Sequence, residues 1–253
     1  MYNLLIGIFG LVIGSFLNVC IVRLPARESI LFPGSHCPKC GLSLKWYHNI
    51  PVLSYLMLGG RCAYCQIKIS LGYPIVEILT AAITIFTFNF YGFTAACLFY
   101  TVFIYFLIVI AFIDWQTGLI HNTTLIALLI FGVLVNLIAP VRDWVDSFWG
   151  FVLGGGCTFL LAVLGKFLFK RDSMGMGDVK LAATAGFFLG TKTILIALYA
   201  GFVIALFFII GIRYLKKSST PDLIPMGPFL AVGLIIFLFW GEKLIQLYWK
   251  LFI

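Results

Sequence analysis

Long apolar segments are the feature that most constrains this chain. A helix needs about 20 apolar residues to cross the hydrocarbon core of a bilayer. Seven segments approach that length and an eighth, 179–190, is shorter; the seven are residues 2–22, 75–91, 94–113, 119–139, 148–168, 194–212 and 229–249. With 62% hydrophobic and 10% charged residues, the chain has too much apolar surface for a globule in water. Because backbone groups in lipid must bond one another, the spans are expected to be helices, which predicts an all-α polytopic membrane protein.

The distribution of Lys and Arg favours eight transmembrane helices over seven. With the N-terminus outside and eight spans, 13 of the 17 basic residues fall in inside connections. Omitting 179–190 would place the basic cluster at 213–217 outside. No Lys or Arg precedes Arg23, so the first segment is predicted to be a retained span and not a cleaved signal peptide. The net charge of +8 is thus assigned to topology and to the lipid bilayer, and no nucleic-acid partner is expected.

The spans divide the chain into three predicted parts. Residues 1–22 form the first transmembrane helix, 23–72 a cytoplasmic loop domain, and 73–253 the remaining membrane domain. The loop is too small for a large hydrophobic core of its own. It is therefore expected to need another source of stability.

Four cysteines in the loop supply that stability. They form two CxxC pairs, Cys37/Cys40 and Cys62/Cys65, a pattern typical of tetrahedral zinc. The topology places the loop in the reducing cytosol, which disfavours the alternative of two disulfide or redox pairs. Four protein ligands leave no open position, so the Zn²⁺ is predicted to be structural.

Three carboxylates abut apolar spans: Glu77, Asp114 and Asp178. Ionisable groups at such positions indicate function by default. Asp114 ends the third predicted span and Asp178 begins the short one, so both are placed at the cytoplasmic side. Two aspartates that share a proton can activate a water and protonate a carbonyl, which is aspartic proteolysis. Gly175 and Gly177 are expected to give the backbone freedom and close approach that the site needs.

Other interpretations of these carboxylates remain open. Asp114 could mark a helix end and Asp178 could be an N-cap. Glu77 could bind a substrate amine or be a hydrogen-bonded structural carboxylate. An ion- or proton-coupled transporter also suits intramembrane carboxylates, although both aspartates lie at one edge of the membrane. A zinc metalloprotease is disfavoured because no HExxH motif is present.

An ordered set of motifs resembles the prepilin peptidase, or type IV leader peptidase, family. The set consists of Gly14-Ser15-Phe16-Leu17-Asn18, Arg23-Leu24-Pro25, the two CxxC pairs around Asn49-Ile50-Pro51, Tyr73-Pro74-Ile75-Val76-Glu77, Asp114, Met174-Gly175-Met176-Gly177-Asp178, and Ile224-Pro225-Met226-Gly227-Pro228. It spans nearly the whole chain. Two departures occur: the family often has Ile-Pro where this chain has Ile120-His121, and a third glycine at Met176.

The resemblance implies a concrete function. Family members are aspartic endopeptidases of the bacterial inner membrane that cut basic leaders from type IV prepilins or pseudopilins at the cytoplasmic face. Asp114 and Asp178 match their two catalytic residues. Many members that keep the cysteine-bearing loop also methylate the new N-terminus with S-adenosylmethionine, so N-methyltransferase activity is implied here as well. The residues of that cofactor site do not follow from the sequence.

Overall fold

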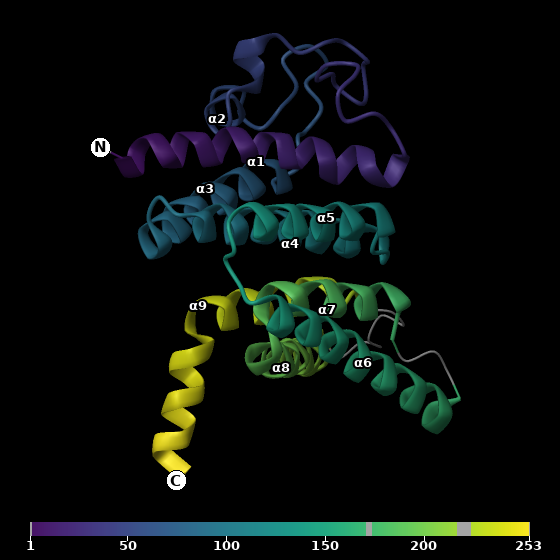
Figure 1. Cartoon of the computed structure of the whole chain (residues 1–253). Coiled ribbons are helices and arrows are strands. Elements are labelled where there is room, and N and C mark those ends of the chain that lie inside the picture. The colour runs from purple at the N-terminus through teal and green to yellow at the C-terminus, as the bar shows by residue number, and fades with distance from the viewer. Residues whose placement is uncertain (1, 171–173, 217–223, 253) are drawn as a thin grey trace. The chain divides into compact units, whose positions relative to one another are not determined.

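The computed structural model describes residues 2–170, 174–216 and 224–252, and these residues are helical with connecting loops (Figure 1). Arg171 and Lys217, two of the basic residues predicted to lie inside, are outside the described residues. The elements are α1 (Tyr2–Ala26), a 3-10 turn η1 (Trp46–Asn49), α2 (Leu53–Met57), α3 (Gly72–Tyr91), α4 (Ala95–Thr117), α5 (Asn122–Ile138), α6 (Trp144–Phe169), α7 (Met176–Leu189), α8 (Thr191–Lys216) and α9 (Gly227–Phe252).

Each of the eight predicted spans coincides with one helix, which confirms the all-α membrane fold. Within the described residues, five helices, α1, α3, α4, α6 and α8, are long and apolar enough to cross a bilayer. Two of the others are shorter, since α5 has 17 residues and α7 has 14, and α9 has 26 residues.

The chain divides into two compact units, Met1–Val109 and Ile110–Ile253. In the first unit α1 packs against α3 through two glycines spaced four residues apart. A Cβ on Gly10 would lie 2.7 Å from Cα of Ala81, and one on Gly14 would lie 2.7 Å from Cα of Glu77. Small residues one helical turn apart therefore allow the two helix backbones to approach closely, as is common between membrane helices.

In the second unit α7 is a buried helix. At 1.5 Å per residue its 14 residues extend about 21 Å, less than the hydrocarbon core. Eleven of the 14 are buried, from Asp178 to Leu189 with Lys180 excepted. Gly150 and Gly154 of α6 face Gly186 and Ala182 of α7 so closely that a Cβ on either glycine would collide with backbone. The neighbouring helices thus cover α7, and it does not need the length of a lipid-facing span.

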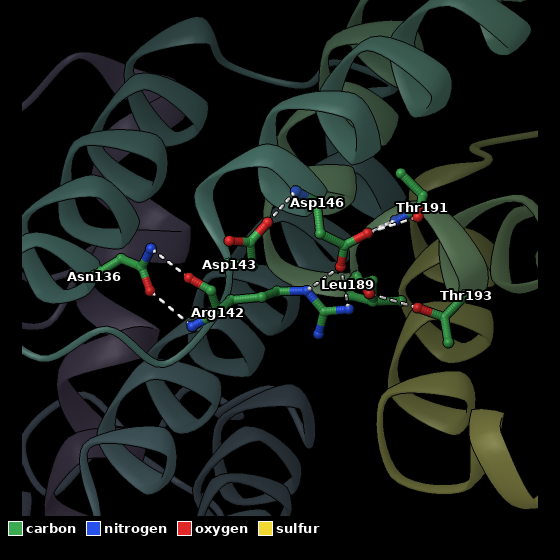
Figure 2. Close-up of polar contacts among 7 residues, drawn as sticks. All are labelled: Asn136, Arg142, Asp143, Asp146, Leu189, Thr191 and Thr193. Atoms are coloured by element: carbon green, nitrogen blue, oxygen red, sulfur yellow. Dashed lines mark hydrogen bonds and ion pairs between the residues drawn. The ribbon is translucent and has the colours of Figure 1, made fainter.

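A polar network joins the start of α6 to the start of α8 (Figure 2). Asp143 caps α6 by accepting a hydrogen bond from the N–H of Asp146, and Asp146 accepts hydrogen bonds from Arg142. The other carboxylate oxygen of Asp146 accepts from both the N–H and the hydroxyl of Thr191, at 3.0 and 2.6 Å. Asn136 holds the preceding turn by bonding the backbone of Arg142. The network fixes where α6 begins relative to α8.

Candidate active site and metal site

Asp114 lies in the last turn of α4, which ends when Gly118 at φ +66° donates its N–H to the carbonyl of Asp114. The Asp114 side chain is only 4% exposed. Its Oδ2 accepts a hydrogen bond of 2.7 Å from the backbone N–H of Gly227 at the start of α9. Asp114 is thus a buried carboxyl group with a defined partner 113 residues away. Gly227 belongs to one of the family motifs, but the sequence alone suggests no role for this glycine.

Asp178 lies in the first turn of α7 and is 8% exposed. The N-cap of α7 is Gly175 and not Asp178, because Gly175 has extended backbone angles and its carbonyl accepts the N–H of Asp178. The N-cap interpretation of Asp178 is therefore wrong for this helix. An acidic side chain in the first turn still interacts favourably with the positive end of the helix dipole.

The start of α7 contacts the connection that follows α4. A Cβ on Gly177 would lie 2.9 Å from Cβ of Ile120, so Gly177 rests directly on that side chain. Lys180 donates a 2.9 Å hydrogen bond to Asn122 at the start of α5. The carboxyl groups of Asp114 and Asp178 are close enough to interact electrostatically. Two buried acids that are 64 positions apart in sequence therefore belong to one local environment within the second unit.

The two glycines before Asp178 differ in their surroundings. Neither adopts a left-handed φ, so conformational freedom does not explain them. Gly177 has no room for a side chain beside Ile120, whereas a Cβ on Gly175 would make only an ordinary contact with Asp178, at 3.4 Å. Close approach accounts for Gly177 and not for Gly175.

Glu77 is buried on α3 in the first unit and is 7% exposed. Its Oε2 accepts a 2.7 Å hydrogen bond from the N–H of Val52, in the loop between the two CxxC pairs. Gly14 of α1 packs against its Cα. Glu77 therefore ties the loop to the membrane helix that follows it.

The four cysteines converge. The Sγ atoms of Cys37, Cys40, Cys62 and Cys65 all lie within 4.8 Å of one another, and those of Cys37 and Cys65 are 3.8 Å apart. A tetrahedral Zn–S distance of about 2.3 Å requires sulfur atoms roughly 3.8 Å apart. Backbone N–H groups of Cys40 and Lys39 lower the pKa of the Cys37 thiol to about 6, whereas burial and the neighbouring cysteines raise the pKa of Cys65 to about 11. Without a metal the cluster therefore favours the thiolate at Cys37, and a bound metal would favour it at the other cysteines. The cluster fits a tetrahedral metal ion.

The two CxxC turns have the same backbone structure, with every equivalent residue shifted by 25 positions. Cys37 exchanges backbone hydrogen bonds with Gly41 and Leu42, and Cys62 exchanges the corresponding bonds with Gln66 and Ile67. Each turn then closes with one antiparallel bridge, His36 to Ser43 and Arg61 to Lys68. Gly41 and Gln66 both have left-handed φ. This repeat was missed, although the similar pattern of an apolar residue two positions after each second cysteine was visible in the sequence.

Comparison with known proteins identifies the family. Residues 8–91 match the bacterial peptidase A24 N-terminal domain, and residues 101–210 match the type IV leader peptidase family. Several proteins named prepilin leader peptidase/N-methyltransferase are similar over almost their full length. The one from Aeromonas salmonicida (strain A449) is 33% identical, and the alignment covers 98% of this chain and 94% of the relative. The one from Pseudomonas aeruginosa is 31% identical, with 95% of this chain and 91% of the relative covered. The one from Neisseria gonorrhoeae is 33% identical, with 92% of this chain and 89% of the relative covered. No solved structure matches the chain significantly.

The fold and the site define a multi-pass helical membrane protein with a four-cysteine loop and two buried, interacting aspartates. The chain belongs to the type IV leader peptidase family, as its motifs predicted. The segment matched to that family contains both Asp114 and Asp178 and ends before Gly227.

Proposed function

We propose that this protein is an aspartic endopeptidase that removes the basic leader from type IV prepilins or pseudopilins. Asp114 and Asp178 are its catalytic residues. The observation that carries the proposal is the burial of these two acids, on α4 and α7, in one environment where their charges interact. Relatives named prepilin leader peptidase/N-methyltransferase support the substrate class.

The chemistry follows from the shared environment of the two acids. Two carboxyl groups close together in a buried site do not both ionise readily, so one proton is retained between them. The ionised group takes a proton from a water molecule, and the water attacks the scissile carbonyl. The protonated group donates a hydrogen bond to the carbonyl oxygen as it becomes tetrahedral.

The active site is proposed to face the cytoplasm, with the N-terminus of the protein outside. The positive-inside rule supports this orientation, since only Arg142, Lys192, Lys243 and Lys250 fall in outside connections. A prepilin has a basic leader followed by an apolar helix. Cleavage at the cytoplasmic boundary of the bilayer matches the point where leader and helix meet.

Residues 23–72 are proposed to form a cytoplasmic zinc domain between the first span, 1–22, and the membrane peptidase domain, 73–253. Four thiolates would complete the coordination of Zn²⁺, so its role is to stabilise the loop and not to activate water. Glu77 supports the same loop through Val52. A second role of Glu77, binding a substrate amine or a leader lysine, would use its other oxygen.

We also propose N-methylation of the new N-terminus, for which S-adenosylmethionine would supply the methyl group. A cavity of about 340 Å³ in the first unit lies between α1 and the loop. Its lining is mostly apolar, with four polar residues, Ser15, Arg23, Ser35 and Asn49, and its volume is within the range of small-molecule sites. Arg23 already donates to the carbonyls of Ser29 and Gly34, so the hydroxyl of Ser15 and the exposed pair Asn49 and Ser35 are the groups that would meet a polar cofactor there.

The decisive experiment incubates purified enzyme with a prepilin and determines the product mass. Loss of the leader tests the peptidase, and an added methyl mass tests the transferase. Asp114→Asn and Asp178→Asn should abolish cleavage while leaving the melting temperature near that of the wild type. Asp143→Asn is the matched control, since Asn caps a helix as well as Asp does. Normal cleavage by either dyad variant would remove that residue from the mechanism.

A further inference from the structure

The carboxylate of Asp114 is held by the start of another helix. Gly227 is the first residue of α9, and its N–H donates to Oδ2 of Asp114 in a fully buried hydrogen bond. No described residue donates a hydrogen bond to the other oxygen, Oδ1. One carboxylate oxygen is therefore fixed by the fold.

The sequence at the start of α9 leaves the N–H of Gly227 free to bond outside the helix. The first N–H groups of a helix have no partner within the helix. Here Pro228 has no N–H, and the N–H groups of Phe229 and Leu230 both bond to the carbonyl of Met226. The N–H of Gly227 therefore has no acceptor within the helix, and it donates its hydrogen bond to Asp114. The positive end of the helix dipole adds to the interaction with a negative charge.

The contact also explains why residue 227 is glycine. A Cβ at this position would lie 2.7 Å from Oδ2 of Asp114 and 3.1 Å from its Cβ and Cγ. Gly227 does not have a left-handed φ, so backbone conformation does not require glycine here. What requires it is the close approach of the α9 backbone to the carboxylate.

We propose that Gly227 is a positioning residue of the peptidase. Its N–H fixes the orientation of the Asp114 carboxylate and stabilises its ionised form, which is the form that activates water. Ile224-Pro225-Met226-Gly227-Pro228 is thus the motif that completes the active site from α9. The inference rests on the proposed function, because it assigns a role through Asp114.

Gly227→Ala tests the inference directly. The added methyl group must displace the carboxylate, so kcat for prepilin cleavage should fall about 10- to 100-fold, the range expected when one hydrogen bond to a charged group is lost. KM should stay within about twofold, since the leader and apolar helix of the substrate do not need Gly227 to bind. Gly211→Ala on α8 is the control, because no atom lies within 4 Å of a Cβ there. It should retain wild-type kcat.

A second variant separates the hydrogen bond from the bulk of the methyl group. Replacement of Gly227 by glycolic acid through nonsense suppression turns the amide into an ester, which removes the N–H and adds no atoms that could clash. Its kcat should also fall at unchanged KM, even if Gly227→Ala lowers the melting temperature. Wild-type kcat in the ester variant, or a raised KM with unchanged kcat, would overturn the inference. If Asp114→Asn itself cleaves normally, the proposed function fails instead.

Discussion

The carboxylate of Glu77 accepts a 2.7 Å hydrogen bond from the backbone N–H of Val52. Val52 has φ +61°, an unfavourable conformation for a β-branched residue. A buried side chain of the membrane domain therefore supports a strained turn in the loop that carries the cysteines. Strain of this kind persists only where surrounding contacts hold it.

Replacement of Glu77 should loosen this loop. Glu77→Ala leaves the Val52 N–H without its acceptor and should cost about 1–3 kcal/mol of unfolding free energy. Glu77→Gln keeps a carbonyl acceptor and should cost less. Limited proteolysis of the 46–60 segment and thermal unfolding in detergent measure both effects. Equal stability of the two variants would show that the hydrogen bond does not hold the loop.

The two glycines before Asp178 should respond differently to alanine. Gly177→Ala places a methyl group against Ile120 and should shift the start of α7, lowering prepilin cleavage at least about tenfold. Gly175→Ala has room for its methyl group and should keep most of the activity. Steady-state cleavage rates of the two purified variants give the comparison. A larger loss for Gly175→Ala would mean that its role lies in motion and not in packing.

Removal of the metal should unfold the loop. We expect one Zn²⁺ per chain in native mass spectrometry, lost in Cys62→Ser and after prolonged chelation. The loop of the metal-free protein should become sensitive to protease, because a small domain without a large core depends on its metal. Cys157→Ser on α6 is the control and should keep its zinc. Two disulfides in place of zinc in the native protein would contradict the assignment.

The Asp146 network should contribute to stability without taking part in catalysis. Asp146→Ala removes the acceptor of Arg142 and of both Thr191 donors, and should lower the unfolding free energy by about 1–3 kcal/mol. Thr191→Val removes one of these donors and should cost about 1 kcal/mol. At temperatures where the variants are folded, kcat for cleavage should match the wild type. A selective loss of kcat would instead connect this network to the dyad.

Local patterns in the sequence predicted most of the architecture. All eight predicted spans correspond to helices. The length of an apolar run is visible in the local sequence, and the thickness of the bilayer sets the length that a spanning helix needs. The boundaries moved by a few residues where capping decided them: α6 begins at Trp144 and not at 148, because Asp143 caps it. The cysteine cluster could also be predicted from the sequence, because the spacing of two CxxC pairs is typical of four thiolates that converge on one metal ion.

The sequence by itself thus determined an all-helical membrane protein, a four-cysteine cluster and two candidate acids. Only the tertiary structure decided that α7 is buried, that Glu77 supports Val52, and that Gly227 donates to Asp114. These relationships join residues 25 to 113 positions apart, or depend on which faces of the helices meet. Apolar helices that look alike in sequence do not specify their neighbours; the close contacts of a few small residues do, and those contacts exist only in the folded protein.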